Sequence, residues 1–228
     1  MRLTLSTAVI FLLSALAWPQ SDSAALDRVL SEMDSAAKTF RSAEATFSTD
    51  HYTKVVDETE TQKGKMYFQR RGKDVEMAAD IAEPDKQYAI YSNGKAQVYN
   101  PKIDQVNEYK AEKNRAQVEA FLLLGFGGGG HDLLASYDAK YIGSESVGGM
   151  NASKLELLPK SQQMRNNIAR ILMWIDPARG VSVQLQLFFP EGDYRLTKYS
   201  DIRINQKLPE NAFKLKTTPK TTFVSPQG

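Results

Sequence analysis

The residues most suggestive of chemistry lie in the stretch FLLLGFGGGGHD, where a run of glycines is followed by His131 and Asp132. Glycine-rich loops can bind phosphate, and a His–Asp pair can serve in acid–base catalysis. A Walker-type loop requires Lys and then Ser or Thr after its last glycine, and His131 and Asp132 occupy those places. A dinucleotide fingerprint requires a preceding strand of a parallel sheet, whereas the residues before these glycines have a helical pattern. Both nucleotide interpretations are therefore excluded.

Other catalytic motifs are also missing from the sequence. The serine hydrolase pattern G-x-S-x-G and the zinc motif H-E-x-x-H do not occur. The two histidines, His51 and His131, are too few for a His-rich zinc site, so we predict neither a metal nor a cofactor. An exported hydrolase that uses His131 and Asp132 stays open as an alternative, although a simply exposed loop histidine is the commoner case.

The first residues, MRLTLSTAVIFLLSALA, have the pattern of a secretory signal peptide. A basic start at Arg2 precedes an apolar run that ends in the small-x-small sequence Ala15-Leu16-Ala17. We expect residues 1–17 to be removed by cleavage near Ala17, which leaves residues 18–228 as one exported domain. The apolar run is short for a membrane span, so an uncleaved anchor is the weaker alternative.

Composition narrows the possible partners. The chain has no cysteine, so it can form neither a disulfide nor a lipid-modified N-terminal cysteine. Removal of the signal peptide lowers the formal net charge from +2 to +1, because Arg2 is its charged residue. No long Lys/Arg run is present, which argues against nucleic acid as a partner. We expect a soluble, monomeric exported protein.

The spacing of apolar residues predicts an α+β domain. Helical spacing covers residues 24–40 and 111–124, and a short helix is predicted over 132–137. Residues 45–109 alternate with a period of two and contain the hairpin signal Asn93-Gly94. Further strands follow in KYIGSESV, ASKLELLPK, ARILMWIDP, VSVQLQLFFP and YRLTKYSDIRIN. The prediction is a single-domain antiparallel sheet of about ten strands with helices on one face.

Two of the later strands carry matching apolar faces. Their apolar odd positions are Ala169, Ile171, Met173 and Ile175 in one strand and Val181, Val183, Leu185, Leu187 and Phe189 in the other. Ser182, Gln184 and Gln186 alternate with the second set, which predicts that one face is buried. That face can be ordinary core beneath the helices or the wall of a cavity, and periodicity alone favours core.

Several short motifs, in order behind the signal sequence, carry a family resemblance. They are ATFSTDHYT, GKMYFQR, SNGKAQVYNP, LELLPK, WIDPARG and NAFKLKTTP. Together they resemble the LolA-type periplasmic carriers of outer-membrane lipoproteins over most of the mature chain. The glycine run departs from the best-known members of that group.

The resemblance implies an incomplete antiparallel barrel, with helices that form a lid over an apolar cavity for acyl chains, and no enzymatic activity. The residues expected to line the cavity are Met66, Phe68, Phe121, Leu122, Ile171, Met173, Leu185 and Leu187. The glycines, interpreted from the sequence as either a hinge or a flexible surface loop, become the hinge of the lid. They are Gly125, Gly127, Gly128, Gly129 and Gly130.

The resemblance also implies an arginine that holds the lid shut. Family members have it on an early strand in an aromatic-x-x-Arg context, and YFQR places Arg70 there. Arg71 follows and replaces the usual proline, so a register shifted by one is the alternative. Strand alternation favours Arg70, because it shares a face with Met66 and Phe68. A solvated surface arginine is the remaining interpretation.

The partners implied by the resemblance are acylated lipoproteins or lipids, an ATP-driven inner-membrane transporter that loads the carrier, and an outer-membrane acceptor that unloads it. Two alternatives stay open beside the hydrolase. One is a lipid-binding or envelope-stress sensing module of the same fold. The other is a structural or adhesive β protein, which would need no cavity.

Overall fold

The computed structural model describes residues 22–72, 74–110 and 115–225. Its helices are α1 (Asp22–Thr39), α2 (Arg115–Leu122), α3 (Leu133–Ser136) and α4 (Gln162–Arg165). Its strands are β1 (Ser42–Thr53), β2 (Glu58–Arg71), β3 (Asp74–Glu83), β4 (Gln87–Ser92), β5 (Lys95–Asn100), β6 (Gln105–Lys110), β7 (Tyr137–Val147), β8 (Met150–Pro159), β9 (Arg170–Asp176), β10 (Val181–Phe188), β11 (Tyr194–Ile204) and β12 (Thr222–Val224). The predicted signal peptide, residues 1–17, lies outside the described residues.

The twelve strands of the described residues form one sheet, in the order β12-β6-β5-β4-β3-β2-β1-β11-β10-β9-β8-β7. Neighbouring strands are antiparallel except β12, which pairs parallel with β6. The outermost strands, β12 and β7, do not pair with each other, so the barrel stays incomplete. The predicted α+β class and incomplete antiparallel barrel are confirmed, with β6 and β12 added to the ten strands expected.

Local sequence signals explain several of these elements. Asn93 and Gly94 both have positive φ, 53° and 73°, and form the two-residue turn between β4 and β5. The buried residues of α1 are spaced as one apolar stripe, at Ala25, Val29, Leu30 and Met33. The helix predicted over 111–124 is found as α2, and its first four predicted residues lie outside the described part of the chain.

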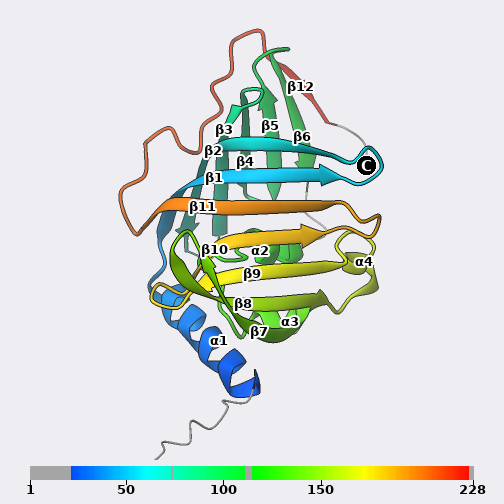
Figure 1. The fold of residues 1–228 in the computed structure, drawn as a ribbon. Helices are drawn as coiled ribbons and strands as arrows, with labels where there is room; N and C mark the ends of the chain where they lie inside the picture. The colour runs from blue at the N-terminus through cyan, green and yellow to red at the C-terminus, as the bar shows by residue number, and fades with distance from the viewer. Residues whose placement is uncertain (1–21, 73, 111–114, 226–228) are drawn as a thin grey trace, which may run out of the picture.

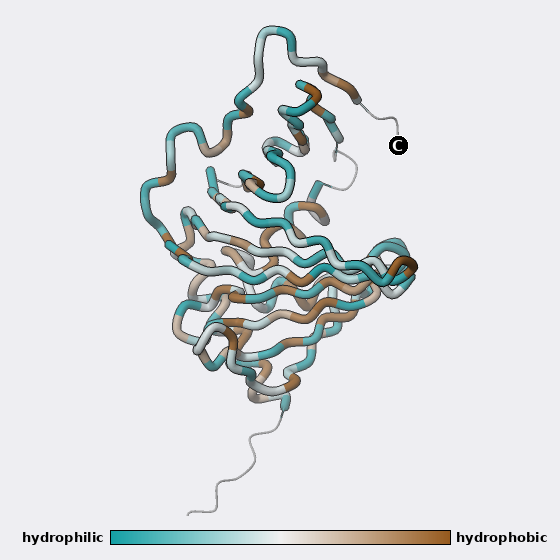
Figure 2. The backbone as a smooth tube through the Cα atoms, turned by 45° about the horizontal axis from the view of Figure 1, so that its top comes forward, coloured by the Kyte–Doolittle hydropathy of each residue, from teal (hydrophilic) through white to brown (hydrophobic). Residues whose placement is uncertain are grey.

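The helices and the core define an inner face of the sheet. In Figure 1, α2 and α3 lie behind the strands, and α1 runs beside β7. The main core forms where Leu30 and Met33 of α1 meet Leu155, Ile171 and Met173 of the sheet. Figure 2 shows apolar and hydrophilic residues alternating along the strands, as a half-buried sheet requires. We call the face that packs against α1 and α2 the inner face.

The prediction that the odd positions of β10 all share one face is wrong, because the strand contains a β-bulge. The register between β9 and β10 shifts between Ser182 and Gln184. Leu185 and Leu187 therefore stay opposite Met173 and Ile171, but Val183 packs in an outer cluster with Leu172 and Trp174. An extra residue in one strand reverses the facing of everything beyond it. Both faces of this region are consequently buried, not one.

The segment between β11 and β12 covers part of the outer face. It runs around the outside of the sheet in Figure 1 and is largely hydrophilic in Figure 2. Its apolar residues Leu208, Ala212, Phe213 and Leu215 pack against Tyr67, Ala78 and Ile90 of β2, β3 and β4. We call residues 206–221 the C-terminal strap. It explains why these outward-facing strand residues are buried.

Candidate functional site

An apolar cavity of about 280 Å³ lies between the inner face of the sheet and α2. Its lining comprises Phe47, Thr49, His51, Gln62, Met66, Phe68, Met77, Ala79, Ile81, Phe121, Leu122, Leu124, Leu185, Leu187, Arg195, Thr197 and Tyr199. The strand residues fall at alternate positions because successive side chains point to opposite faces. Most of the lining is aliphatic or aromatic, so the cavity suits an apolar ligand.

Six of the eight residues predicted to line a cavity lie there together. They are Met66, Phe68, Phe121, Leu122, Leu185 and Leu187. Ile171 and Met173 do not belong to the lining, since both are 0% exposed in the core beneath α1. The sequence left two interpretations open for the apolar faces of β9 and β10, ordinary core or cavity wall. In the structure, the face of β9 is core, and the end of β10 is cavity wall.

One end of the cavity is polar, which the sequence analysis missed. Thr49 and His51 of β1 pair in register with Thr197 and Arg195 of β11, and all four line the cavity. The hydroxyl oxygens of Thr49 and Thr197 are 2.9 Å apart. Burial, and then the charge of Arg195, lowers the pKa of His51. The alternation of His51 with Thr49 and Phe47 along β1 was the available signal.

Polar contacts hold α2 over the cavity at its N-terminal end. Nη2 of Arg115 donates a hydrogen bond of 2.6 Å to Asp74 on β3, and its Nε donates one of 2.7 Å to Glu119. The hydroxyl of Tyr91 on β4 also donates to Glu119, at 3.2 Å. These contacts join the helix to two neighbouring strands and so fix one end of the cavity roof.

Arg70 makes a second set of contacts, beyond the other end of α2. Its Nη2 donates a hydrogen bond of 2.6 Å to the carbonyl oxygen of Gly127, and its Nη1 donates one of 3.4 Å to that of Ala37. Its guanidinium also lies 6.0 Å from the ring centroid of Phe40. Ala37 is in the last turn of α1, where helix carbonyls lack internal partners and a cation is favourable. Arg70 thus joins β2, α1 and the glycine segment.

Arg71 lies on the opposite side of β2. Its side chain is 65% exposed and forms an ion pair of 3.0 Å with Glu76 on β3. The contacts with Gly127 and Ala37 therefore come from Arg70, as strand alternation predicts.

The glycine segment is closely packed. Gly125 and Gly127 have positive φ, 92° and 80°, which favours glycine. A Cβ at Gly127 would lie 2.3 Å from Phe40, and one at Gly130 would lie 2.2 Å from the carbonyl oxygen of Leu30. Phe126, between Gly125 and Gly127, is 0% exposed, and its ring stacks on that of Phe68 with the centroids 4.7 Å apart. The backbone at Gly127 and Gly130 thus lies too close to Phe40 and to α1 for a larger residue, which is one reason for glycine at these positions. Their hinge role stays a prediction.

His131 is held by α1, not by Asp132. Its Nδ1 lies 2.5 Å from Oδ2 of Asp34, and its Nε2 lies 3.2 Å from Oδ1 of Asp27. Hydrogen bonds to Asp34 and Asp27 raise the pKa of His131 above its usual value. Both ring nitrogens are engaged by carboxylates, so the geometry of a general base beside a nucleophile is not formed.

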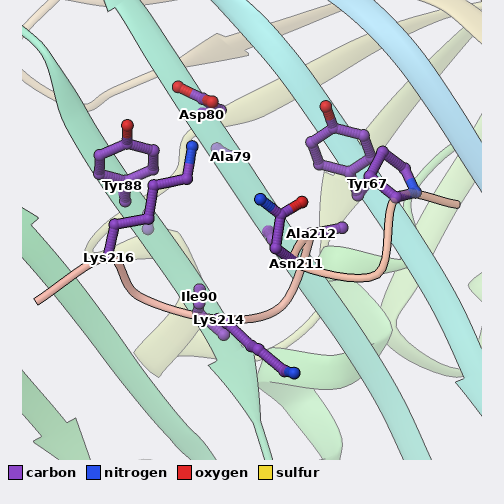
Figure 3. Close-up of a pocket in the computed structure, with 12 residues that line it drawn as sticks. Tyr67, Ala79, Asp80, Tyr88, Ile90, Asn211, Ala212, Lys214 and Lys216 are labelled. Carbon is purple, nitrogen blue, oxygen red and sulfur yellow. The ribbon is translucent and has the colours of Figure 1, made fainter.

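A smaller pocket lies on the outer face, beneath the C-terminal strap. Figure 3 shows the strap crossing the strands there, with Lys216 beside Tyr88 and Asn211 near Tyr67. Its volume is about 40 Å³, close to the share of one water molecule, about 30 Å³. An acyl chain does not fit in that space, so this pocket is not a candidate site for one.

The solved structures most informative about the fold share little sequence with this chain. MucB has a TM-score of 0.54 at 14% identity, and the match covers 84% of this chain and 63% of MucB. An uncharacterized conserved protein from Thermus thermophilus has a TM-score of 0.54 at 13% identity, over 90% of this chain and 99% of that one. The lipoprotein LppX of Mycobacterium tuberculosis has a TM-score of 0.52 at 12% identity, over 83% and 99%.

These likenesses establish the fold alone, and this chain spans less than two thirds of the length of MucB. Among curated proteins, none matches the sequence. Within the described residues, the helices are too short or too polar to span a bilayer. The model of the family described as outer membrane lipoprotein carrier protein LolA matches residues 38–216, which is more than half of the chain. An incomplete barrel with an apolar cavity agrees with that match, and the chain belongs to the LolA family.

Proposed function

We propose that this protein binds acyl chains of lipoproteins in the cavity under α2 and carries them through the periplasm from the inner to the outer membrane. The observation that supports it is a space lined mainly by aliphatic and aromatic side chains from the sheet and α2. Burial of a methylene group contributes roughly 0.8 kcal/mol, so a long acyl chain exposed to water costs on the order of 10 kcal/mol. A carrier must offset much of that cost.

The size of the cavity suits a small load in the present conformation. Its volume of about 280 Å³ is near the lower limit of ligand pockets, which are about 300–1,000 Å³. Larger cargo therefore requires α2 to move away from the sheet. Met66 and Met77 line the cavity, and flexible methionine side chains can adapt to chains of different shape.

Two arginines would control that movement. Arg115 joins the start of α2 to Asp74, and Arg70 joins the segment after α2 to β2. Hydrogen bonds from a charged donor stabilise by about 1.5–3 kcal/mol each, so together they favour the closed, empty state. In this proposal Arg70 is the latch and the glycines at 125 and 127–130 are the hinge. When the lid opens and these hydrogen bonds break, the burial of cargo in the cavity would offset their loss.

The proposed route includes the segments that flank the site. Residues 1–17 would direct export and be cleaved near Ala17, and residues 18–228 would act as the carrier domain in the periplasm. An ATP-driven inner-membrane transporter would load it, and an outer-membrane acceptor would receive the cargo. Lipid-modified proteins, rather than nucleic acids, are the proposed partners.

Mass spectrometry under non-denaturing conditions tests the binding step. The protein, exported from a diderm bacterium, should carry an acylated species that detergent removes. Leu187→Trp should fill part of the cavity and lower acyl-ligand uptake about tenfold or more, given that roughly 1.4 kcal/mol corresponds to tenfold. Ile142→Trp is the matched control, because Ile142 is 45% exposed on β7 and outside the cavity lining. Absence of bound and added acyl ligand in the unmodified protein would overturn the proposal.

A transfer assay separates a carrier from a sensing module of the same fold. The loaded protein is mixed with vesicles that contain outer-membrane extract, and the labelled lipoprotein is followed. A carrier should release its cargo to these vesicles. Retention of cargo under those conditions would instead favour a module that binds lipid without delivering it.

A further inference from the structure

The residues that line the cavity change from apolar at one end to polar at the other. On β1, the inward-facing residues run from Phe47 to Thr49 and His51, and on β11 they run from Tyr199 to Thr197 and Arg195. These two strands are paired in register, so the apolar residues meet at one end and the polar residues meet at the other. A ligand that matches this lining has an apolar chain and a polar head.

Among the lining residues that the structure describes, Arg195 brings the one permanent charge. The other sixteen described residues of the lining are uncharged at neutral pH, and for His51 this is because burial and the charge of Arg195 lower its pKa. Within the described residues, Arg195 forms no ion pair and makes no hydrogen bond through its guanidinium. That group lies 5.3 Å from the ring centroid of Phe189. Its donors therefore remain available to a ligand.

The position of Arg195 differs from that of the other inward-facing arginine. Arg70 is not part of the cavity lining, and its guanidinium is engaged by carbonyl oxygens of α1 and the glycine segment. Arg195 and His51 line both the cavity and an adjoining surface depression of about 230 Å³. They thus stand at the boundary between the apolar space and the surface.

Acidic side chains near this boundary lie outside the cavity lining. Glu60, the register partner of His51 on β2, is exposed. Asp193 accepts a hydrogen bond of 2.9 Å from the backbone N–H of Lys54, and Glu191 is exposed in the surface depression. Inside the cavity lining, a headgroup at this end meets the guanidinium of Arg195 together with the hydroxyls of Thr49 and Thr197.

We infer that Arg195, with His51, Thr49 and Thr197, forms a subsite for the anionic headgroup of an amphiphile whose chain occupies the apolar part of the cavity. This inference rests on the proposed function and adds a charge preference to it. A guanidinium binds carboxylate or phosphate through two parallel hydrogen bonds, which makes either group a suitable head.

Four amphiphiles with the same chain test the inference on the full mature protein. Tetradecanoate and tetradecyl phosphate are anionic, tetradecanol is neutral, and tetradecyltrimethylammonium is cationic. Their affinities are measured by displacement of an apolar fluorescent dye. Both anions should bind about tenfold more tightly than tetradecanol, as expected for one charged hydrogen-bonding contact. Stronger binding of tetradecyl phosphate would identify a phosphate-bearing lipid, and stronger binding of tetradecanoate a free fatty acid.

Arg195→Gln should reduce the preference for anions to about twofold or less and leave tetradecanol affinity unchanged. Arg203→Gln is the matched control, since Arg203 is exposed on the same strand and outside the cavity lining. Equal binding of anions and tetradecanol by the unmodified protein, tighter binding of the cation, or an unchanged preference in Arg195→Gln would overturn the inference while the proposed function stands. Failure of every amphiphile to displace the dye would overturn both.

Discussion

The guanidinium of Arg70 on β2 donates a hydrogen bond of 2.6 Å to the carbonyl oxygen of Gly127. These two residues are distant in sequence and belong to different parts of the site, the sheet wall and the segment that follows the α2 roof. The contact makes the position of that segment depend on one side chain. It also relates the glycine run to the cavity, because a displaced Gly127 would release the residues just after α2.

Replacement of Arg70 by Leu should destabilise the closed conformation. Loss of the hydrogen bond to Gly127 leaves a carbonyl without its charged donor, which costs roughly 2 kcal/mol. For a domain of this size the melting temperature should fall by about 4–8 °C. Limited proteolysis should show faster cleavage between residues 115 and 131. Arg71→Leu is the control and should change neither property by much, since Arg71 is 65% exposed. Equal protease sensitivity of the two variants would exclude Arg70 as the latch.

Gly127→Ala should destabilise the protein more than an ordinary glycine substitution. The new Cβ would lie 2.3 Å from the ring of Phe40, and the positive φ of 80° already disfavours alanine. We expect a loss of more than about 2 kcal/mol from overpacking and backbone strain together. Gly72→Ala is the matched control, because Gly72 has a φ of 63° and nothing within 4 Å of the added Cβ. Its cost should be about 1 kcal/mol, measured by urea unfolding. Similar costs at both positions would contradict the packing argument.

Hydrogen exchange tests the hinge role of the same glycines. If they act as a hinge, exchange of the backbone amides at 125–130 should change when an acyl ligand binds, because the segment must rearrange as α2 moves. Amides of β9 in the core serve as the reference. Unchanged exchange at 125–130 in the presence of bound ligand would leave the glycines with a packing role alone.

The contact of His131 with Asp34 and Asp27 should make stability depend on pH. The hydrogen bonds to both carboxylates raise the pKa of His131 above its ordinary 6.5, so the stability that it contributes is lost as pH rises through the raised value. Burial alone would raise the pKa of Asp34, but its hydrogen bonds with His131 lower it below 3.8. That contribution is lost as pH falls through the lowered value.

The contribution of the pair is therefore greatest between about pH 4 and pH 6.5. The melting temperature of the unmodified protein minus that of His131→Gln should peak in this window and decline on both sides. His51→Gln is a control on a different element, and its difference curve should lack that peak. A difference that stays constant from pH 4 to pH 9 would contradict the assigned ion pair.

The C-terminal strap should contribute to stability through its apolar residues. Phe213 packs against the outer cluster of Tyr67, Ala78 and Ile90, so Phe213→Ala should cost about 1–2 kcal/mol for a partly buried ring. Phe223→Ala is the control, since Phe223 is 55% exposed, and a surface substitution should change stability by less than about 0.5 kcal/mol. Urea unfolding of both variants measures the difference. Equal midpoints would show that the strap adds nothing to the stability of the sheet.

Elements whose pattern is local were predicted correctly from the sequence. The apolar stripe of α1, the period-two strands and the Asn93-Gly94 turn each depend on residues close together in the chain. Alternation combined with the family resemblance also predicts Met66, Phe68, Leu185 and Leu187 as lining residues, and all four lie around the cavity. Their role in binding stays a prediction. For the helix, the strands and the turn, the local sequence was enough to predict the element.

Elements that depend on distant partners were not predicted. The three-residue β12 is a strand because β6 lies beside it, and its own residues carry too short a pattern to show this. The bulge in β10 turned Val183 outward, which alternation by itself does not reveal. Ile171 and Met173 became core because α1 covers them.

The sequence by itself determined the family, the α+β class, the antiparallel sheet and the apolar character of the site, since these follow from periodicity and motifs. Tertiary structure decided which apolar residues surround empty space and which are packed, because that depends on where the helices lie. It also decided that Arg195 and His51 stand together at one end of the cavity and that His131 pairs with α1. Such juxtapositions arise from strand register and helix docking, which join residues far apart in the chain.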